Sequence, residues 1–427
     1  MVESVQVGVA QHDITPDDSI WLVGYGDRDH KSEGIYQRLR SGAIYICGTT
    51  QSTLIITADL IGFDLEFAAR AKAIISELTG LLPEQIILSA THTHCAPFFY
   101  PWVMPGSPDK AYANRLIKDL LSVGLAAIKS AQPGNILFSR CSSSFGVNRR
   151  LPNKNGGVDF APNPDGPIDR DLDTLWMIDK SERTIGTLTF YGCHPTSLGG
   201  YLIGGDYPGY LCREIERETN TPALFATGCA GNIRPWYPSN EGGFTRPTFE
   251  QLESAGKKLA TDVLASRKNH RKIRASDMMI TGTFHKLPYA DIPTSEALHA
   301  AAASKDIRLR EWAEIMHLHL ENGPLPAHCP QEIQLLKLDN EHQVVFLGGE
   351  ILAEIGLRIK QTLNPTTTIT CAYSNGLIGY VPSQSTYDLG GYEVSGSHHL
   401  FRRPAPFHRD VEQLIIEQVQ LLSKSFN

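Results

Sequence analysis

The sequence predicts an α/β fold in which mixed β-sheets are flanked by helices. Apolar runs of strand length alternate along the 427 residues with longer stretches whose apolar residues repeat at helical spacing. No linker and no shift in composition divides the chain, so we expect a single domain over residues 1–427 with strands and helices intermixed. Hydrophobic residues make up 41% of the chain, which is enough for a large core and excludes global disorder.

In the first half of the chain, residues 5–10 alternate between apolar and polar side chains and predict the first strand. An apolar run at 86–88 predicts a buried strand that continues through the histidines after it. Residues 151–170 are rich in Pro, Asn, Gly and Asp and predict a loop. The other expected strands are 42–48, 53–58, 134–140, 174–179 and 184–191, and the expected helices are 64–79 and 110–131.

The second half continues the same alternation. A short strand, 223–226, follows a helix that runs from Asp206 to about residue 219. A long helical stretch is expected at 294–322, and a further helix is expected to start at Glu350. The remaining expected strands are 277–286, 332–338, 343–348 and 367–373, and the remaining expected helices are 247–266 and 409–424.

Charge and composition exclude several classes of partner. The 39 basic and 46 acidic residues give a formal charge of −7 without a run of Lys or Arg, so neither nucleic acid nor an anionic membrane is expected as a partner. No apolar run reaches membrane-spanning length, and the N-terminus lacks the pattern of a signal peptide. The eight cysteines contain no CxxC pair and are expected to be reduced, which favours a cytoplasmic location. The oligomeric state stays open, a homo-oligomer included.

The segment from Leu88 to Pro97 contains two histidines, His92 and His94, two positions apart. In an extended chain, residues two apart point to the same side, so both imidazoles would face one place. Two imidazoles aimed at one place are typical of a metal site or a proton-transfer site. The alternative is that they are ordinary polar residues at the end of a strand.

Three further segments pair an apolar strand with a small-residue loop that carries one polar side chain. They contribute His194, Glu350 and Tyr380. Two His and one Glu are the ligand set of a catalytic zinc, which leaves one position for water, and a tyrosine oxygen could be a fourth ligand or an oxyanion donor. Each residue also has a plain structural explanation: a buried hydrogen-bonded histidine, an acid at a helix start, and a packed ring. Sequence spacing does not decide between these explanations.

The chain resembles the neutral/alkaline ceramidase family, specifically its zinc-dependent amidase domain. The resemblance implies that His92, His194, Glu350 and Tyr380 are zinc ligands and that His94 and Arg149 contact the substrate near the scissile amide. The matching segments occur in the family's order and cover nearly the whole chain: Gly24-Tyr25, Glu33-Gly34-Ile35, Asp59, Thr91-His92-Thr93-His94, Asn148-Arg149, His194-Pro195-Thr196-Ser197, Gly205-Asp206, Gly231-Asn232, Gly349-Glu350, Tyr380, Tyr387 and Tyr392-Glu393.

Departures from the family pattern change the expected substrate. The family's serine, in a Gly-Asn/Asp-x-Ser-Pro segment, falls on Arg234, and the Ser-Gly-Pro-Gly after the histidine pair is replaced by Cys95-Ala96-Pro97-Phe98. The sequence also ends where ceramidases add a β-sandwich domain. We therefore expect a cytosolic relative that acts on a smaller, soluble amide. Arg234 would suit a carboxylate on that substrate, because guanidinium binds carboxylate bidentately, although a surface or ion-paired arginine is the alternative.

The expected reaction follows from this ligand set. Zinc lowers the pKa of its bound water towards ~7, and the resulting hydroxide attacks the amide carbonyl. Tyr380 and His94 would stabilise the oxyanion or pass a proton to the leaving amine. Asp206 could orient a ligand histidine, or it could simply cap the helix that begins beside it.

Four other functions stay open at this stage. One is true ceramidase activity on N-acylsphingosine, and a second is hydrolysis of an ester or lactone, which the same hydroxide attacks. A third is an amidase whose nucleophile is Cys95 or Cys193, activated by His94. The fourth is a non-catalytic protein that binds zinc with closed coordination.

Overall fold

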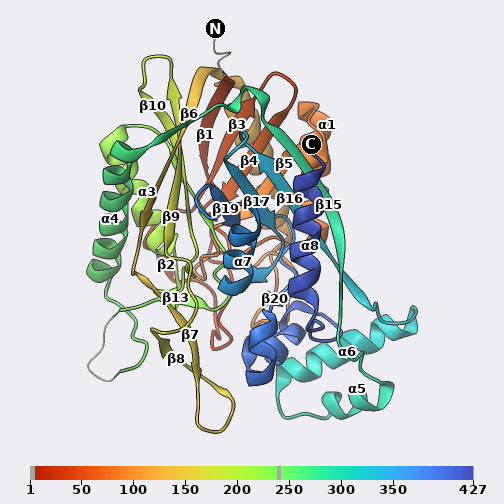
Figure 1. Ribbon diagram of the computed structural model, residues 1–427. Coiled ribbons are helices and arrows are strands. Elements are labelled where there is room, and N and C mark those ends of the chain that lie inside the picture. Colours follow the sequence, from red (N-terminus) through yellow and green to blue (C-terminus); the bar gives the residue numbers. More distant parts are fainter. Residues whose placement is uncertain (1–4, 238–241, 427) are drawn as a thin grey trace.

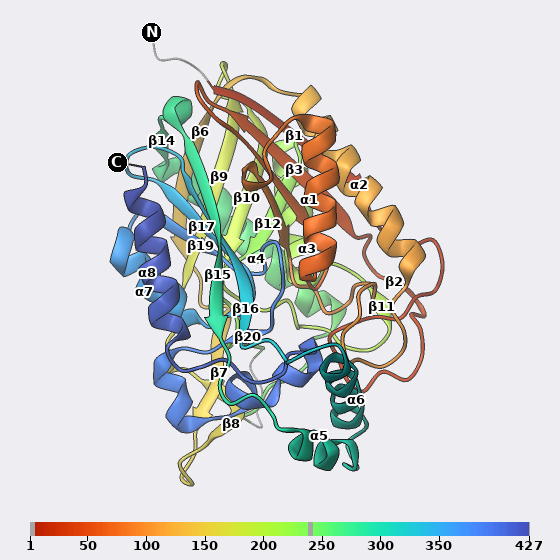
Figure 2. The same cartoon turned by 90° about the vertical axis from the view of Figure 1, so that its right-hand side faces the viewer.

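The computed structural model describes residues 5–237 and 242–426 (Figure 1). Two β-sheets pack against each other, and helices cover the outer faces of both. In Figure 2, helices α7 (Ala353–Leu363) and α8 (Val411–Lys424) lie on one side of the sheets, and α1 (Leu65–Thr79) and α2 (Lys110–Lys129) lie on the other. The predicted α/β class with mixed sheets and flanking helices is confirmed.

The larger sheet has nine strands and mixes parallel with antiparallel pairs. Its order is β12-β10-β9-β6-β1-β3-β4-β5, with β14 paired to β6. Strands β4 and β5 are parallel, as are β10 and β12, and the other pairs are antiparallel. The bounds are β1 (Val5–Asp13), β3 (Arg40–Cys47), β4 (Ser52–Ala58), β5 (Ile86–Ala90), β6 (Gln132–Ser142), β9 (Asp171–Asp179), β10 (Thr184–Tyr191), β12 (Ala223–Thr227) and β14 (Arg271–Ile273).

The smaller sheet has the order β15-β16-β17-β19. Its strands are β15 (Met279–Pro288), β16 (His328–Lys337), β17 (Gln343–Leu347) and β19 (Thr368–Cys371). The core between the sheets includes Val7 and Ile136 from the larger sheet and Leu336 and Phe346 from the smaller one, all fully buried. Burying a side chain of this size contributes about 1.5–3 kcal/mol, so this layer is a main source of stability.

Alternation along single strands explains why the larger sheet is covered on both faces. In β4, Ile55 faces the other sheet, whereas Leu54 and Ile56 face the helices. The helices against that outer face are α1, α2, α3 (Asp206–Thr219) and α4 (Phe249–Ser266). Helix α1 begins after Asp64, whose side chain accepts a hydrogen bond from the Phe67 amide, and ends at Gly80 with φ 74°.

Four expectations about elements were wrong. The stretch 294–322 forms two helices, α5 (Ser295–Ala302) and α6 (Ile307–Glu321), because Asp306 caps a new start. The predicted loop at 151–170 contains a hairpin of β7 (Gly146–Pro152) and β8 (Val158–Asn163). The strand expected to run through the histidines ends at Ala90, and the helix expected from Glu350 begins at Ala353.

Three small sheets lie near one end of the two large ones. They are β2 (Gly34–Ile35) with β11 (Leu202–Ile203), β13 (Ile233–Pro235) with β7 and β8, and β18 (Glu350–Ile351) with β20 (Tyr380–Val381). Figure 1 shows β2, β13, β7, β8 and β20 in the lower half of the molecule. Among the helices of the described part of the chain, none combines the length and the apolar character that crossing a bilayer demands.

The edge strands of the larger sheet, β5 and β12, meet at this same end. The Thr227 hydroxyl donates to the Thr91 carbonyl at 2.6 Å. The segment after β19 joins them, because the Ala372 amide donates to Thr227 O and the Ala90 amide donates to Tyr373 O. The loops that follow β5, β10, β12 and β19 are therefore held together, although they are far apart in sequence.

Candidate active site

His92 reaches the site through a turn of the backbone and not through strand alternation. Its φ is 65°, in the left-handed region that a residue with a side chain enters at a cost of about 1–2 kcal/mol. The His92 amide donates to Leu60 O, and its Nδ1 lies 2.6 Å from Ile61 O. Because a carbonyl only accepts, Nδ1 carries the hydrogen and the neutral ring presents a lone pair on Nε2.

His194 is fixed in the same way. It follows β10 and is completely buried. Its amide donates to Ile233 O at 3.0 Å, and its Nδ1 donates to Ala230 O at 2.5 Å. The lone pair of its Nε2 therefore faces the same place as that of His92, and the two ring centroids are 4.7 Å apart.

A ladder of two residues places Glu350 beside Tyr380. Strands β18 and β20 are parallel, with Glu350 opposite Tyr380 in register, and the Glu350 amide donates to Gly379 O at 2.8 Å. The residues before each strand, Gly349 and Gly379, have φ of 114° and 106°, which residues with a side chain rarely adopt. These glycines allow both strands to begin in the same orientation at the site.

The four predicted ligands converge. Glu350 Oε2 lies 3.3 Å from His92 Nε2 and 3.1 Å from His194 Nε2, and Tyr380 Oη lies 3.4 Å from His194 Nε2. Two ligand atoms that are each about 2.0–2.1 Å from zinc in a tetrahedral site are about 3.3 Å apart, so this donor set fits a zinc ion. His94 also joins, with its Nε2 at 3.3 Å from His92 Nε2, and the three histidines form a cluster that could hold a metal ion.

The surroundings favour the protonation states that metal binding requires. Burial lowers the pKa of His194 to about 4, and burial together with the charges of His92 and His194 lowers the pKa of His94 well below its usual value. Burial alone would raise the pKa of Glu350, but the interactions with His92 and His194 outweigh it and lower that pKa. The lowered pKa values of His194 and His94 favour neutral rings, and these lie beside an ionised Glu350, which favours binding of a cation.

Arg149 connects the Tyr380 hydroxyl to an acid. Arg149 Nη2 donates to Tyr380 Oη at 3.1 Å, and its Nε donates to Glu393 Oε1 at 2.9 Å. Arg150 donates to the other oxygen of Glu393 at 2.5 Å. Burial raises the pKa of Tyr380 well above its usual value even though Arg149 opposes the shift, so its hydroxyl stays protonated without a metal.

Asp206 does not contact a histidine ring in this structure. Its Oδ2 accepts from the Ser197 and Leu198 amides, at 2.9 and 3.2 Å, and its Oδ1 accepts from the Tyr207 amide. Backbone carbonyls orient the ring nitrogens of His92 and His194 instead. Asp206 is the first residue of α3 and fixes the loop that follows His194, so its geometry corrects the expectation that it orients a ligand.

Two tyrosines that the sequence reasoning gave no role pack on the histidines. The Tyr373 ring lies on His92, with centroids 4.1 Å apart, and the Tyr25 ring lies 5.0 Å from His94. Arg28, also missed, donates to the carbonyls of Val23, His94 and Gly200 and so ties three loops together. The one sequence signal for any of these three residues is that Tyr373 lies two positions after the end of β19.

The remaining predicted residues lie beside this cluster. Arg234, on β13, borders it and donates to Thr196 O at 3.3 Å. Cys95 and Cys193 are buried, and burial raises the pKa of Cys95 to about 12 and that of Cys193 well above its usual value. The Cys193 thiol donates to the carbonyl of His194 and not to its ring, so neither cysteine has the features of an activated nucleophile.

A family model for the N-terminal region of neutral/alkaline non-lysosomal ceramidases matches residues 5–253. The chain belongs to the neutral/alkaline ceramidase family. The matched region contains His92, His94 and His194, whereas Glu350 and Tyr380 lie beyond it.

Two curated relatives agree with this family. Neutral ceramidase A of Dictyostelium discoideum is 24% identical over 253 residues, covering 56% of this chain and 35% of the relative. Neutral ceramidase of Mycobacterium tuberculosis is 27% identical over 221 residues, covering 46% of this chain and 33% of the relative. In each match, this chain covers about a third of the length of the relative.

The crystal structure of neutral ceramidase from Pseudomonas aeruginosa has the same fold. Its TM-score is 0.77 at 18% identity, and the match covers 99% of this chain and 75% of that one. The ceramidase fold therefore extends over the elements that supply Glu350 and Tyr380, which the family model does not reach.

Proposed function

We propose that this chain is a zinc-dependent amidohydrolase that cleaves a linear amide, or N-acyl, bond of a small soluble substrate. The observation that carries the proposal is the convergence of His92, His194, Glu350 and Tyr380 from loops far apart in sequence, at separations that suit one zinc ion. Membership of the ceramidase family supports an amide as the bond that is cleaved.

The side chains of the site have three separate roles: metal binding, stabilisation of negative charge and proton transfer. His92, His194, Glu350 and Tyr380 would hold the ion, which when bound would activate water and polarise a carbonyl. Arg149 fixes the Tyr380 hydroxyl at 3.1 Å, where it can donate to an oxygen that gains negative charge. His94, neutral and adjacent to His92, is placed to accept or return a proton.

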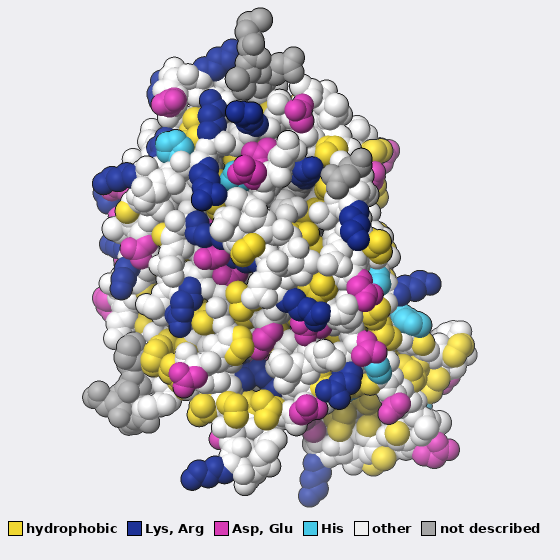
Figure 3. Space-filling view, viewed as in Figure 1, with side chains coloured by type: hydrophobic (Ala, Val, Ile, Leu, Met, Phe, Trp, Pro, Cys, Tyr) yellow, Lys and Arg dark blue, Asp and Glu magenta, His cyan; other side chains and the backbone are white. Residues whose placement is uncertain are grey.

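Hydrolysis of N-acylsphingosine is the second candidate, and an exposed apolar surface favours it. Figure 3 shows apolar side chains gathered at the end formed by α5 and α6, where Ile307 and Leu318 are 67% and 58% exposed. Helix α6 packs on the segment 398–403, and Phe401 from that segment packs against Tyr380. A lipid substrate could use such a surface, whereas a small soluble amide would not need it.

Metal analysis combined with a substrate panel tests the proposal. We expect about one zinc per chain in the wild type and loss of zinc from His92→Ala and His194→Ala, because each removes one ligand. The matched control is His270→Ala, which replaces an exposed histidine away from the site. Short N-acyl amides should be cleaved, chelator should abolish cleavage, and zinc should restore it.

Full zinc occupancy in both histidine variants would contradict the metal assignment, and cleavage that survives chelation would contradict a metal-dependent reaction. Long-chain ceramide in detergent serves as the comparison substrate. Preference for ceramide over short amides would favour the second candidate, and preference for the corresponding esters would assign the enzyme to ester hydrolysis.

A further inference from the structure

Beside the histidine cluster lies an arginine whose side chain has no acidic partner in the described residues. Arg234 is on β13, where it pairs in register with Val147, two residues before Arg149. Its neighbour Ile233 supplies a carbonyl that accepts from the His194 amide. The backbone that orients His194 therefore also fixes Arg234 at the edge of the site.

Arg234 is half-buried, and among the described residues its guanidinium is incompletely hydrogen-bonded. Its Cζ lies 4.4 Å from the Phe244 ring centroid and 5.4 Å from that of Phe160. Nη2 donates to Thr196 O at 3.3 Å, but Nε is buried and, in the described part of the chain, has no acceptor. The buried hydroxyl of Thr196 likewise has no partner there. Buried donors without acceptors cost free energy, and these two point to a group that arrives with the substrate.

A second arginine lies on the same side of the site. The Arg246 Cζ is 5.3 Å from the Tyr25 ring centroid, and the same ring lies 5.0 Å from the His94 ring. Arg246 rests on the Gly199 backbone so closely that a Cβ at Gly199 would lie 1.4 Å from Nη1. Burial lowers the pKa of Arg234, and the positive charges of Arg149 and Arg246 lower it further, which agrees with three guanidinium groups near one another.

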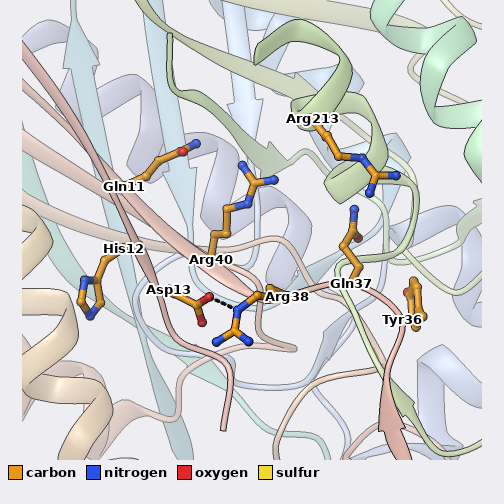
Figure 4. A pocket seen from close by; sticks show the side chains of 8 residues that line it. All are labelled: Gln11, His12, Asp13, Tyr36, Gln37, Arg38, Arg40 and Arg213. Atoms are coloured by element: carbon orange, nitrogen blue, oxygen red, sulfur yellow. Dashed lines mark hydrogen bonds and ion pairs between the residues drawn. The ribbon is translucent and has the colours of Figure 1, made fainter. Parts of the chain in front are cut away.

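Among the residues described, neither Arg234 nor Arg246 forms an ion pair, whereas Arg149 is paired with Glu393. Three arginines that line another pocket do form ion pairs. The pocket in Figure 4 is lined by Arg38, Arg40 and Arg213, which pair with Asp13, Glu216 and Glu253 respectively. That pocket is rich in arginine, but its positive charge is neutralised. Among the described residues, no carboxylate pairs with Arg234 at the active site, so its charge is available to a substrate.

We propose that Arg234 and Arg246 form an anion subsite that selects amides carrying a carboxylate a few bonds from the scissile bond. This inference rests on the proposed amide hydrolysis and names its substrate class. A guanidinium binds a carboxylate with two parallel hydrogen bonds, and the rings of Phe160 and Phe244 border the guanidinium of Arg234. Nε of Arg234 and the hydroxyl of Thr196, which have no partner among the described residues, would donate to the carboxylate oxygens.

Three compounds that differ by one group test the subsite. N-ethylbutanamide is neutral, N-butanoylglycine carries a carboxylate on the amine side, and succinic acid monoethylamide carries it on the acyl side. We expect the kcat/KM of one of the two acids to exceed that of the neutral amide by about 10- to 100-fold, the worth of a charge-assisted hydrogen bond. Which acid is preferred shows on which side of the amide the subsite lies.

Variants show whether the preference belongs to these arginines. Arg234→Ala should lower kcat/KM for the preferred acid by about the same factor, to about the level of N-ethylbutanamide. Arg234→Lys should restore only part of the preference, because lysine lacks the planar guanidinium that forms two parallel hydrogen bonds. Arg246→Ala, at an exposed residue, should have a smaller effect in the same direction. The control is Arg213→Ala, an arginine of the Figure 4 pocket, which should leave the preference unchanged.

A binding measurement separates this inference from the proposed function. Calorimetry on metal-free protein should detect succinic acid monoethylamide or N-butanoylglycine, but not N-ethylbutanamide, and Arg234→Ala should abolish that binding. Equal kcat/KM for all three amides, or anion binding that persists in Arg234→Ala, would overturn the subsite and leave amide hydrolysis standing. Failure to cleave any amide while the wild type still binds the acids would refute the hydrolysis and keep the subsite.

Discussion

The Tyr380 hydroxyl lies between His194, a proposed metal ligand, and the guanidinium of Arg149. Its oxygen is 3.4 Å from His194 Nε2, among the atoms that would hold a cation, and it accepts a hydrogen bond from Arg149 at 3.1 Å. Because Arg149 is itself fixed by Glu393, the hydroxyl has little freedom to move. A group held in this way can stabilise charge at one defined position, which is how preorganised donors lower a barrier.

Tyr380→Phe should therefore lower kcat by about 100-fold or more while changing KM little, because the lost interaction is stronger in the transition state than in the ground state. Kinetics on the amide that the wild type cleaves best, with zinc content measured in parallel, checks this. Tyr45→Phe, which removes a hydroxyl bonded to Ser52 on the larger sheet, is the control. An unchanged kcat in Tyr380→Phe would show that the hydroxyl does not stabilise the transition state and that Tyr380 only packs against its neighbours.

At the level of single residues, the sequence predicted which side chains would lie together, but it did not predict every backbone conformation that brings them together. His92 and His94 do lie together, yet the strand ends at Ala90, and the left-handed φ of His92 turns its ring to the site. No local pattern indicates that conformation, because the contacts that hold it come from Leu60 and Ile61. Tyr25 and Tyr373 were missed because ring stacking depends on the tertiary arrangement.

At the level of elements, the ladder of β18 and β20 has the largest effect on the site. Two residues in each strand suffice to place Glu350 opposite Tyr380. Gly349 sets the start of β18, and its carbonyl accepts from the Tyr373 amide. A Cβ on Gly349 would lie 3.1 Å from Ile378 and 3.2 Å from the Gly379 carbonyl oxygen, and φ of 114° would be strained for any other residue.

Gly349→Ala should consequently destabilise the protein by about 1–3 kcal/mol and also weaken zinc binding, because relief of the strain shifts Glu350. Gly80→Ala is the matched control: Gly80 also has positive φ, but it ends α1 where a Cβ meets open space. In denaturant unfolding of the metal-free protein, Gly80→Ala should lose less stability than Gly349→Ala, and its zinc affinity should equal that of the wild type. Zinc affinity equal to wild type in Gly349→Ala would show that the ladder does not position the ligand.

Element prediction succeeded for most segments of long periodicity, the stretch 294–322 excepted, and failed where periodicity is absent. Helices α2 and α4 and the hairpin of β9 and β10 lie within a few residues of their predicted bounds. Strands β18 and β20 have two residues each, too few for any period. The hairpin of β7 and β8 was missed because its composition is typical of loops. Pairing with partner strands, and not local propensity, stabilises it.

On the scale of the whole molecule, the site lies at the end of the fold where the edge strands β5 and β12 of the larger sheet meet. The family resemblance indicated the arrangement of layers, which periodicity alone could not provide because strand pairing across the chain is non-local. Sequence-distant segments after β5, β10, β17 and β19 meet where the edge strands join through Thr227 and Thr91. An ion held by His92, His194 and Glu350 would add a further cross-link between three of these segments.

Zinc should therefore stabilise the whole fold and not only the site. A ligand that binds only the native state adds about 4 kcal/mol when its free concentration is 1,000 times its Kd, so chelation should lower Tm by several degrees. Melting curves recorded at one scan rate, with chelator and with two concentrations of zinc, measure the effect. His194→Ala should melt at one temperature under all three conditions, because it lacks a ligand. A wild-type Tm that responds to neither chelator nor zinc would mean that these segments are held together by protein contacts alone, and that the convergence of His92, His194 and Glu350 does not depend on an ion.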